Sequence, residues 1–161
     1  MNEEVKYISY EEAISVYAKM IDASDGGFDG VRDEGGIRAS LEFVQNDMYY
    51  PNFSDKLCSL VYKFCSGHYF NDGNKRIALT LGAYFLYKNS YFWQATIFMR
   101  QMESIVYHVA ASNIDQDLLL RIMTCFMDGE DYDEELKIDI ANAMSRGELG
   151  VRGEDYDNEF E

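Results

Sequence analysis

Apolar residues recur every three to four positions along most of the chain, which is the spacing of one face of an α-helix. The first such segment follows Ser9 and Glu12, which have the spacing of a helix capping box. The same reading predicts further helices, so the full set covers residues 9–23, 37–46, 54–67, 74–88, 96–111, 115–128 and 133–146. Because no stretch alternates convincingly between apolar and polar residues, the pattern predicts an all-α bundle.

The segments between these helices are marked by glycines, a proline or aromatic residues. Residues 24–36 are predicted to form a loop rich in Gly and Asp, and residues 68–73 a second glycine-containing loop. Met48–Phe53 is predicted to be an extended aromatic link interrupted by Pro51, the single proline of the chain. The run 91–93 (Tyr-Phe-Trp) is predicted to be a short link, and residues 147–161 are expected to be flexible.

Length and charge limit the classes of protein that this chain can be. At 161 residues it is expected to form one domain with a proper core. Its net charge of −15 argues against a nucleic-acid-binding protein. No apolar run approaches the roughly 20 residues of a membrane span, and the acidic N-terminus lacks the features of a signal peptide. We therefore expect a cytoplasmic protein with no membrane partner.

The acidity is concentrated near the C-terminus. Residues 129–161 contain twelve Asp and Glu against three Lys and Arg, and so carry −9 of the net −15. This contrast predicts a division into a catalytic unit at 1–128 and an acidic extension at 129–161 that is partly helical and then flexible.

The segment Gly67–Arg76 gathers chemically distinct groups in front of a predicted helix. Backbone N–H groups at a helix N-terminus point outward, and the helix dipole adds positive potential, so this loop predicts an anion site, with phosphate as the expected anion. Gly73 lets the backbone approach an anion closely. Cations oppose the dipole at this end, so Lys75 and Arg76 indicate an anionic ligand, although both could be ordinary solvated charges.

Three more residues of this segment have both a chemical and a structural interpretation. His68 could take a proton from an attacking hydroxyl group, or could be a surface histidine. Asp72 could hold a magnesium ion that bridges phosphates, or could cap the following helix. Asn74 could cap that helix, bind a phosphate, or do both.

The run His68–Arg76 resembles the signature of the Fic/Doc family, His-x-Phe-x-Asp/Glu-Gly-Asn-x-Arg. Within that family it looks like the Doc (death-on-curing) branch, whose pattern His-x-Phe-x-Asp-Gly/Ala-Asn-Lys-Arg it matches at every fixed position. The stretches 26–33 and 49–51 also look like the Doc branch. The resemblance covers roughly residues 5–127 and leaves the acidic extension unmatched.

The resemblance implies a Fic/Doc-type helical bundle built around a central helix, the motif loop and a second helix. It implies that His68 is the catalytic base and that Asp72 binds Mg²⁺. It also implies that ATP is held by the residues at the start of the second helix, with Lys75 taking part in catalysis as well: Gly73, Asn74, Lys75 and Arg76. The segment Tyr49, Tyr50, Pro51 and Asn52 would form a flap that aligns the target by backbone pairing, with a plain linker as the alternative.

For the Doc branch, the resemblance implies a kinase-like toxin that transfers the terminal phosphate of ATP to a threonine of elongation factor Tu and so halts translation. A small antitoxin would be its partner. Two other functions stay open. An AMP transferase of the same scaffold would have glycine in place of Lys75 and arginine in place of Leu79, so these departures weigh against it. A non-catalytic binding module with this fold would not need the intact His68 and Asp72.

Overall fold

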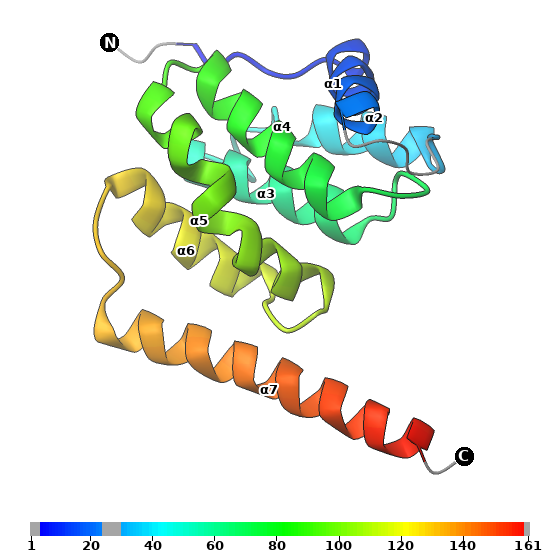
Figure 1. The fold of residues 1–161 in the computed structure, drawn as a ribbon. Coiled ribbons are helices and arrows are strands. Elements are labelled where there is room, and N and C mark those ends of the chain that lie inside the picture. Colours follow the sequence, from blue (N-terminus) through cyan, green and yellow to red (C-terminus); the bar gives the residue numbers. More distant parts are fainter. Residues whose placement is uncertain (1–3, 24–29, 160–161) are drawn as a thin grey trace.

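The computed structural model describes residues 4–23 and 30–159, with side chains as far as Arg146, and the described residues form seven α-helices (Figure 1). The helices are α1 (Tyr10–Ala23), α2 (Glu34–Phe43), α3 (Phe53–Ser66), α4 (Asn74–Lys88), α5 (Phe92–Ala110), α6 (Gln116–Asp128) and α7 (Glu134–Glu159). Among the described residues the β-type pairing is limited to one isolated bridge between Val31 and Phe70. The all-α prediction is therefore confirmed.

Helix α3 lies at the centre of the bundle and contacts α2, α4, α5 and α6. It buries residues around most of its circumference: Lys56, Leu57, Cys58, Ser59, Leu60, Val61, Phe64 and Cys65. Helix α4 packs on one side of α3, and α5 packs closely on α4, because a Cβ atom at Gly82 would lie 2.5 Å from the Phe98 ring. The central pair, α3 and α4, is joined by the loop 67–73, which begins one residue before the predicted loop 68–73.

Helix α1 runs across α4 in the opposite direction and is fixed at both ends. Near its start, the Glu12 carboxylate accepts hydrogen bonds from the Lys88 ammonium and the Tyr84 hydroxyl group at the end of α4. Further along, the Tyr17 ring stacks on Phe70 with 4.0 Å between ring centroids. The predicted bounds of this helix are correct to within one residue, and the Ser9–Glu12 capping box forms through both reciprocal bonds.

Helix α2 differs from its predicted bounds at both ends. It begins at Glu34 rather than residue 37, because the Asp33 carboxylate accepts a hydrogen bond from the Gly36 amide at 2.8 Å and caps the helix. Two glycines in the first turn are tolerated once that cap is present. The helix ends at Phe43 rather than near residue 46. Because it begins at Glu34, residues 34–36 of the predicted loop 24–36 are helical and residues 30–33 are not, while residues 24–29 lie outside the described part.

The segment predicted to be an extended link, Met48–Phe53, is wrong in part, because residues 47–49 form turns and Phe53 already belongs to α3. Asn46 causes this difference. Its side-chain oxygen accepts hydrogen bonds from the amides of Met48 and Tyr49, and its carbonyl accepts one from Tyr50. Such local bonding by Asn side chains favours turns over extended chain.

The aromatic run 91–93 is also not a link, because α5 begins at Phe92. The chain reverses within residues 89–91, where Ser90 has φ +70° and the Tyr91 amide donates to the Leu86 carbonyl. This tight reversal leaves α5 running back along α4. The aromatic residues therefore form the first turn of a helix instead of a spacer.

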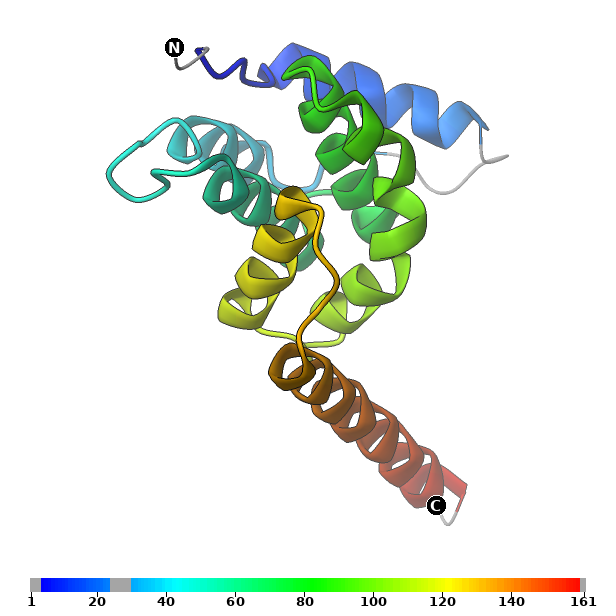
Figure 2. The same ribbon diagram turned by 90° about the vertical axis from the view of Figure 1, so that its left-hand side faces the viewer.

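Helix α7 is longer than predicted, since it continues to Glu159 instead of ending near residue 146. Glycines at 147, 150 and 153 weaken a helix by about 1 kcal/mol each but do not break it as proline does. Leu136, Ile140 and Ala143 are buried against the bundle, and Asp139 pairs with Arg121 of α6. Figures 1 and 2 show the second half of α7 pointing away from the other helices. Within the described residues, none of the helices has both the length and the apolar character to cross a membrane.

Candidate active site

His68 stands at the point where α3 ends and the motif loop begins. Gly67 caps α3, and its amide donates to the Lys63 carbonyl at 2.8 Å. His68 follows with φ +53°, in the left-handed region that glycine usually occupies directly after a helix. A non-glycine residue costs about 1 kcal/mol there, and such costs cluster at functional sites. The imidazole is exposed to solvent and so can be reached by a substrate.

The backbone on the C-terminal side of His68 is held by α2 and the segment before it. The Tyr69 carbonyl accepts hydrogen bonds from the amides of Arg32 and Asp33, at 2.8 and 3.0 Å. The Tyr69 hydroxyl group lies 2.6 Å from the Ser40 hydroxyl group. These contacts fix the loop through Tyr69, and among the described residues none of the hydrogen bonds involves the His68 ring.

The Asn74 side chain bonds to the backbone of Phe70 and so bridges the motif loop. Its side-chain oxygen accepts a hydrogen bond from the Phe70 amide at 3.1 Å, and its side-chain nitrogen donates to the Phe70 carbonyl at 3.0 Å. Phe70 itself is buried and stacks on Tyr17, whose hydroxyl group donates to the Asp72 carbonyl at 3.0 Å. Asn74 therefore acts as a brace across the loop, and phosphate binding by its side chain stays a prediction.

Gly73 places the loop against the N-terminus of α4. It adopts φ +78°, and a Cβ atom there would lie 3.1 Å from the Met20 side chain of α1. Within the part of the chain that the structure describes, no side chain caps α4, and the first amides of an α-helix have no partner within the helix. Helix N-termini of this kind suit anions, and anion binding at the start of α4 stays a prediction.

Asp72 lies beside this helix end with its carboxylate exposed. One carboxylate oxygen accepts a hydrogen bond from the Gly73 amide at 2.8 Å, which leaves the second oxygen for a ligand. Within the described residues, no three His, Cys, Asp or Glu side chains converge as a metal site. A single carboxylate fits Mg²⁺ that is bound mainly by nucleotide phosphates, and such sites are usual for this ion.

The two cations of the motif lie on different sides of α4. The Lys75 ammonium nitrogen is 5.9 Å from the centroid of the Tyr107 ring near the end of α5. Arg76 is exposed and lines an open hollow of about 480 Å³ between α1, α4 and α5, with Lys19, Met20 and Met99 on its walls. One cation thus faces each flank of the helix N-terminus.

The predicted flap, residues 49–52, folds back along α3 toward the motif loop. The Tyr50 hydroxyl group accepts a hydrogen bond from the Lys63 ammonium at 3.1 Å, one helical turn before Gly67. Burial acts to raise the pKa of the Tyr50 phenol, but the nearby Ser59 hydroxyl group and Lys63 ammonium outweigh it and lower that pKa. Tyr49 is 71% exposed and its ring contacts that of Tyr50, so the flap presents one exposed and one anchored ring.

The backbone donors of this flap are already used. The amides of Met48, Tyr49 and Tyr50 bond to Asn46, and the Asn52 amide donates to the Asp55 carboxylate at 2.9 Å. Pro51 has no amide hydrogen. A target segment would therefore find carbonyl acceptors on the flap, and target alignment by this segment stays a prediction.

Several residues that shape the site were not predicted from the sequence. Tyr17, Tyr69 and Lys56 are not singled out by the sequence motifs. Lys56 is in fact 2% exposed, and its ammonium donates to the Val44 carbonyl and to Asp47 at the base of the flap. Lys56 stands between Asp55 and Leu57, and this local sequence carries no signal of its burial.

Comparison with known proteins identifies the family. The family model described as the Fic/DOC family matches residues 7–86, which span α1 to α4 and include the motif loop. The chain is also similar to the protein kinase doc of Escherichia phage P1, with 35% identity over 88 residues, or 53% of this chain and 69% of the phage protein. With its complete motif on the α3–α4 loop and this similarity over most of the phage protein, the chain belongs to the Doc branch of the Fic/Doc family.

Proposed function

We propose that this protein is a Doc-like toxin that transfers the γ-phosphate of ATP to a threonine hydroxyl group of a protein, with elongation factor Tu as the target. The observation that carries the proposal is the position of His68, which is exposed on a braced loop directly before an uncapped helix N-terminus. The name of the phage relative, a protein kinase, supports the same chemistry. The predicted antitoxin would restrain this activity in the cell.

In the proposed reaction, His68 takes the proton of the threonine hydroxyl group as its oxygen attacks the γ-phosphorus. A bond forms between that oxygen and phosphorus, the bond from phosphorus to the β–γ bridging oxygen breaks, and ADP leaves with the electron pair. The start of α4, Lys75 and Arg76 hold the phosphates and spread their charge. Bound Mg²⁺, with Asp72 as its protein ligand, would neutralise phosphate charge and align the leaving group.

AMP transfer is the second candidate, and the surroundings of α4 weigh against it. Leu79 occupies the position where AMP-transferring members have an arginine, and it is only 7% exposed. A leucine side chain has no hydrogen-bond donor for a phosphate group. Lys75, in place of glycine, adds a cation at the helix end instead, which suits a terminal phosphate.

The deciding experiment uses ATP labelled separately at the α and γ positions, with Mg²⁺, elongation factor Tu and the purified protein. We expect label from the γ position only, and none with His68→Ala, whose folding is checked by circular dichroism. Label from the α position would replace the kinase assignment with AMP transfer. If a cell lysate accepts γ-label where elongation factor Tu does not, the chemistry stands and the target is wrong. Absence of His68-dependent label from either position would overturn the proposal.

A further inference from the structure

A second hollow lies at the opposite end of the molecule from the motif loop. Helices α4 and α5 are antiparallel, because Lys75 at the start of α4 meets Tyr107 near the end of α5. The hollow sits at the start of α5, next to the end of α4, and so about 20 Å from the motif, which is the length of α4. It therefore does not belong to the candidate active site.

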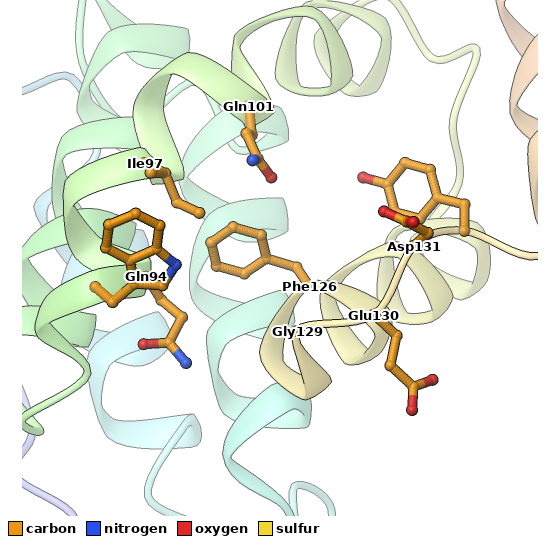
Figure 3. A pocket seen from close by; sticks show the side chains of 9 residues that line it. Gln94, Ile97, Gln101, Phe126, Gly129, Glu130 and Asp131 are labelled. Atoms are coloured by element: carbon orange, nitrogen blue, oxygen red, sulfur yellow. The ribbon is translucent and has the colours of Figure 1, made fainter.

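Three segments build this hollow of about 480 Å³. Trp93, Ile97 and Gln101 form a stripe along α5, Phe126 comes from the last turn of α6, and Asp131 from the chain between α6 and α7. Figure 3 shows Ile97, Gln101, Phe126 and Asp131 around one open space, with the Asp131 side chain turned toward it. Gly129 leaves the floor open, because a Cβ atom there would meet nothing within 4 Å.

The walls combine exposed aromatic surface with unpaired negative charge. Trp93 is 71% exposed, and the described residues offer its indole no hydrogen-bond partner. Tyr132 is half-buried, and burial raises the pKa of its phenol. None of the ion pairs among the described residues includes Asp131 or its neighbour Glu130. The hollow therefore places aromatic rings next to carboxylates that have no ion-pair partner among the described residues.

From this combination we infer that the hollow between α5, α6 and the α6–α7 connection is a docking site for an arginine side chain of a basic partner protein. A guanidinium group stacks on an indole ring and bonds to a carboxylate in the same plane, and the Gln101 amide adds an acceptor beside it. The short stretch 129–135 holds five carboxylates and no lysine or arginine, so its local charge would draw a basic partner to this hollow. The inference does not depend on the proposed phosphate transfer.

Trp93 also provides the measurement, because it is the single tryptophan of the chain. The full protein is titrated with the peptide acetyl-Ser-Gly-Arg-Gly-Ser-amide, and with the same peptide carrying citrulline, the uncharged analogue of arginine. We expect the arginine peptide to change Trp93 emission with a saturable curve that weakens as salt is added. The citrulline peptide should give no saturable change. Peptide held elsewhere on the acidic extension would leave the emission of Trp93 unaltered.

Matched variants assign the binding to the hollow. Asp131→Asn should weaken binding about tenfold, because it removes the charge-assisted hydrogen bond to the guanidinium group. Glu103→Gln removes one negative charge from an exposed position on α5 outside the hollow and should leave the affinity within about twofold. The inference is overturned if the two peptides behave alike, if Asp131→Asn binds as the unaltered protein does, or if Glu103→Gln weakens binding as much as Asp131→Asn.

Discussion

His68 occupies a backbone conformation that suits glycine better than histidine. Its φ of +53° directly after α3 costs about 1 kcal/mol for any residue with a Cβ atom. The chain nevertheless carries the one side chain there that can serve as a base near neutral pH. Stability and the proposed chemistry therefore oppose each other at this residue.

This opposition predicts different behaviour for two variants of the same position. His68→Gly should exceed His68→Ala in free energy of unfolding by about 1 kcal/mol, because glycine relieves the left-handed strain and alanine does not. Both variants should lose phosphate transfer. Urea unfolding of the three proteins measures the first effect, and γ-label transfer measures the second. Equal stability of the two variants would show that the left-handed conformation is not strained.

Asn74 gives a second prediction at the residue scale. Asn74→Ala removes both bonds to the Phe70 backbone and leaves a part-buried donor and acceptor unsatisfied, so the free energy of unfolding should fall by about 1–3 kcal/mol. Asn74→Asp keeps an oxygen for the Phe70 amide but loses the donor to the Phe70 carbonyl. Its free energy of unfolding should lie between those of the unaltered protein and Asn74→Ala. Thermal unfolding checks the order. If Asn74→Ala lost transfer without losing stability, phosphate binding would be the better account of this residue.

At the scale of elements, the stability that the contact between α1 and α4 contributes should depend on pH, because this contact includes Glu12. Hydrogen bonds from Lys88 and then Tyr84 lower the pKa of this carboxyl group from 4.5 to about 2, although burial opposes the change. A lowered pKa stabilises the fold above pH 4.5, and this contribution is lost as the pH falls toward 2. Because the side chain is 32% exposed, we expect about 1–2 kcal/mol at neutral pH.

The test compares the unaltered protein with Glu12→Gln, whose amide oxygen can still accept from Lys88 and Tyr84, but which carries no charge and has no second oxygen for the Ser9 amide. The unaltered protein should be the more stable at pH 7, and the difference should shrink between pH 4.5 and pH 2. Other carboxyl groups titrate equally in both proteins and cancel in the difference. A difference that stays constant over this range would mean that the charge of Glu12 does not stabilise the contact between α1 and α4.

The flap depends on a buried lysine of α3. Lys56 donates to the Val44 carbonyl at 3.1 Å and to the Asp47 carboxylate at 2.8 Å. Burial acts to lower the pKa of the Lys56 ammonium, but Asp47 and Tyr7 outweigh it and raise that pKa. Lys56→Met keeps the length of the side chain and removes the donor, so the free energy of unfolding should fall by about 1.5–3 kcal/mol.

If the flap aligns the target, Lys56→Met should also raise KM for the protein target several-fold and leave KM for ATP unchanged. Lys56→Arg keeps the charge and should restore part of the affinity. Steady-state kinetics at varied target and varied ATP separate the two constants. An equal rise in both would mean that the variant disturbs the whole site and not the flap.

The sequence predicted those elements that are specified by residues close together in the chain. The capping box at Ser9, the repeat of α4 and the motif between α3 and α4 all lie within a few residues of the structure that they specify. The contacts that brace the site join residues far apart, such as Tyr17 with Phe70, and no local pattern encodes them. The predicted bounds were wrong where a side chain bonded to the backbone, as with Asn46 before the flap and Asp33 before α2.

At the scale of the whole molecule, α7 divides into a part that packs and a part that projects. Leu136, Ile140 and Ala143 are buried, and Asp139 pairs with Arg121, all within the first three turns. Beyond them the helix leaves the bundle (Figure 2). The first half of α7, which lies beyond the predicted boundary at residue 129, thus contributes side chains to the same core as the helices before it.

Two variants test this division. A chain ending at Arg146 should keep a melting temperature within about 2 °C of the full chain, while its net charge changes from −15 to −10 because residues 147–161 hold six acids and one arginine. Leu136→Ala in the full chain should lower the free energy of unfolding by about 2–4 kcal/mol, because it opens a cavity under α7. Calorimetry measures both. A large loss of stability in the shortened chain would show that the projecting half supports the bundle, and the boundary between core and extension would then lie beyond residue 146.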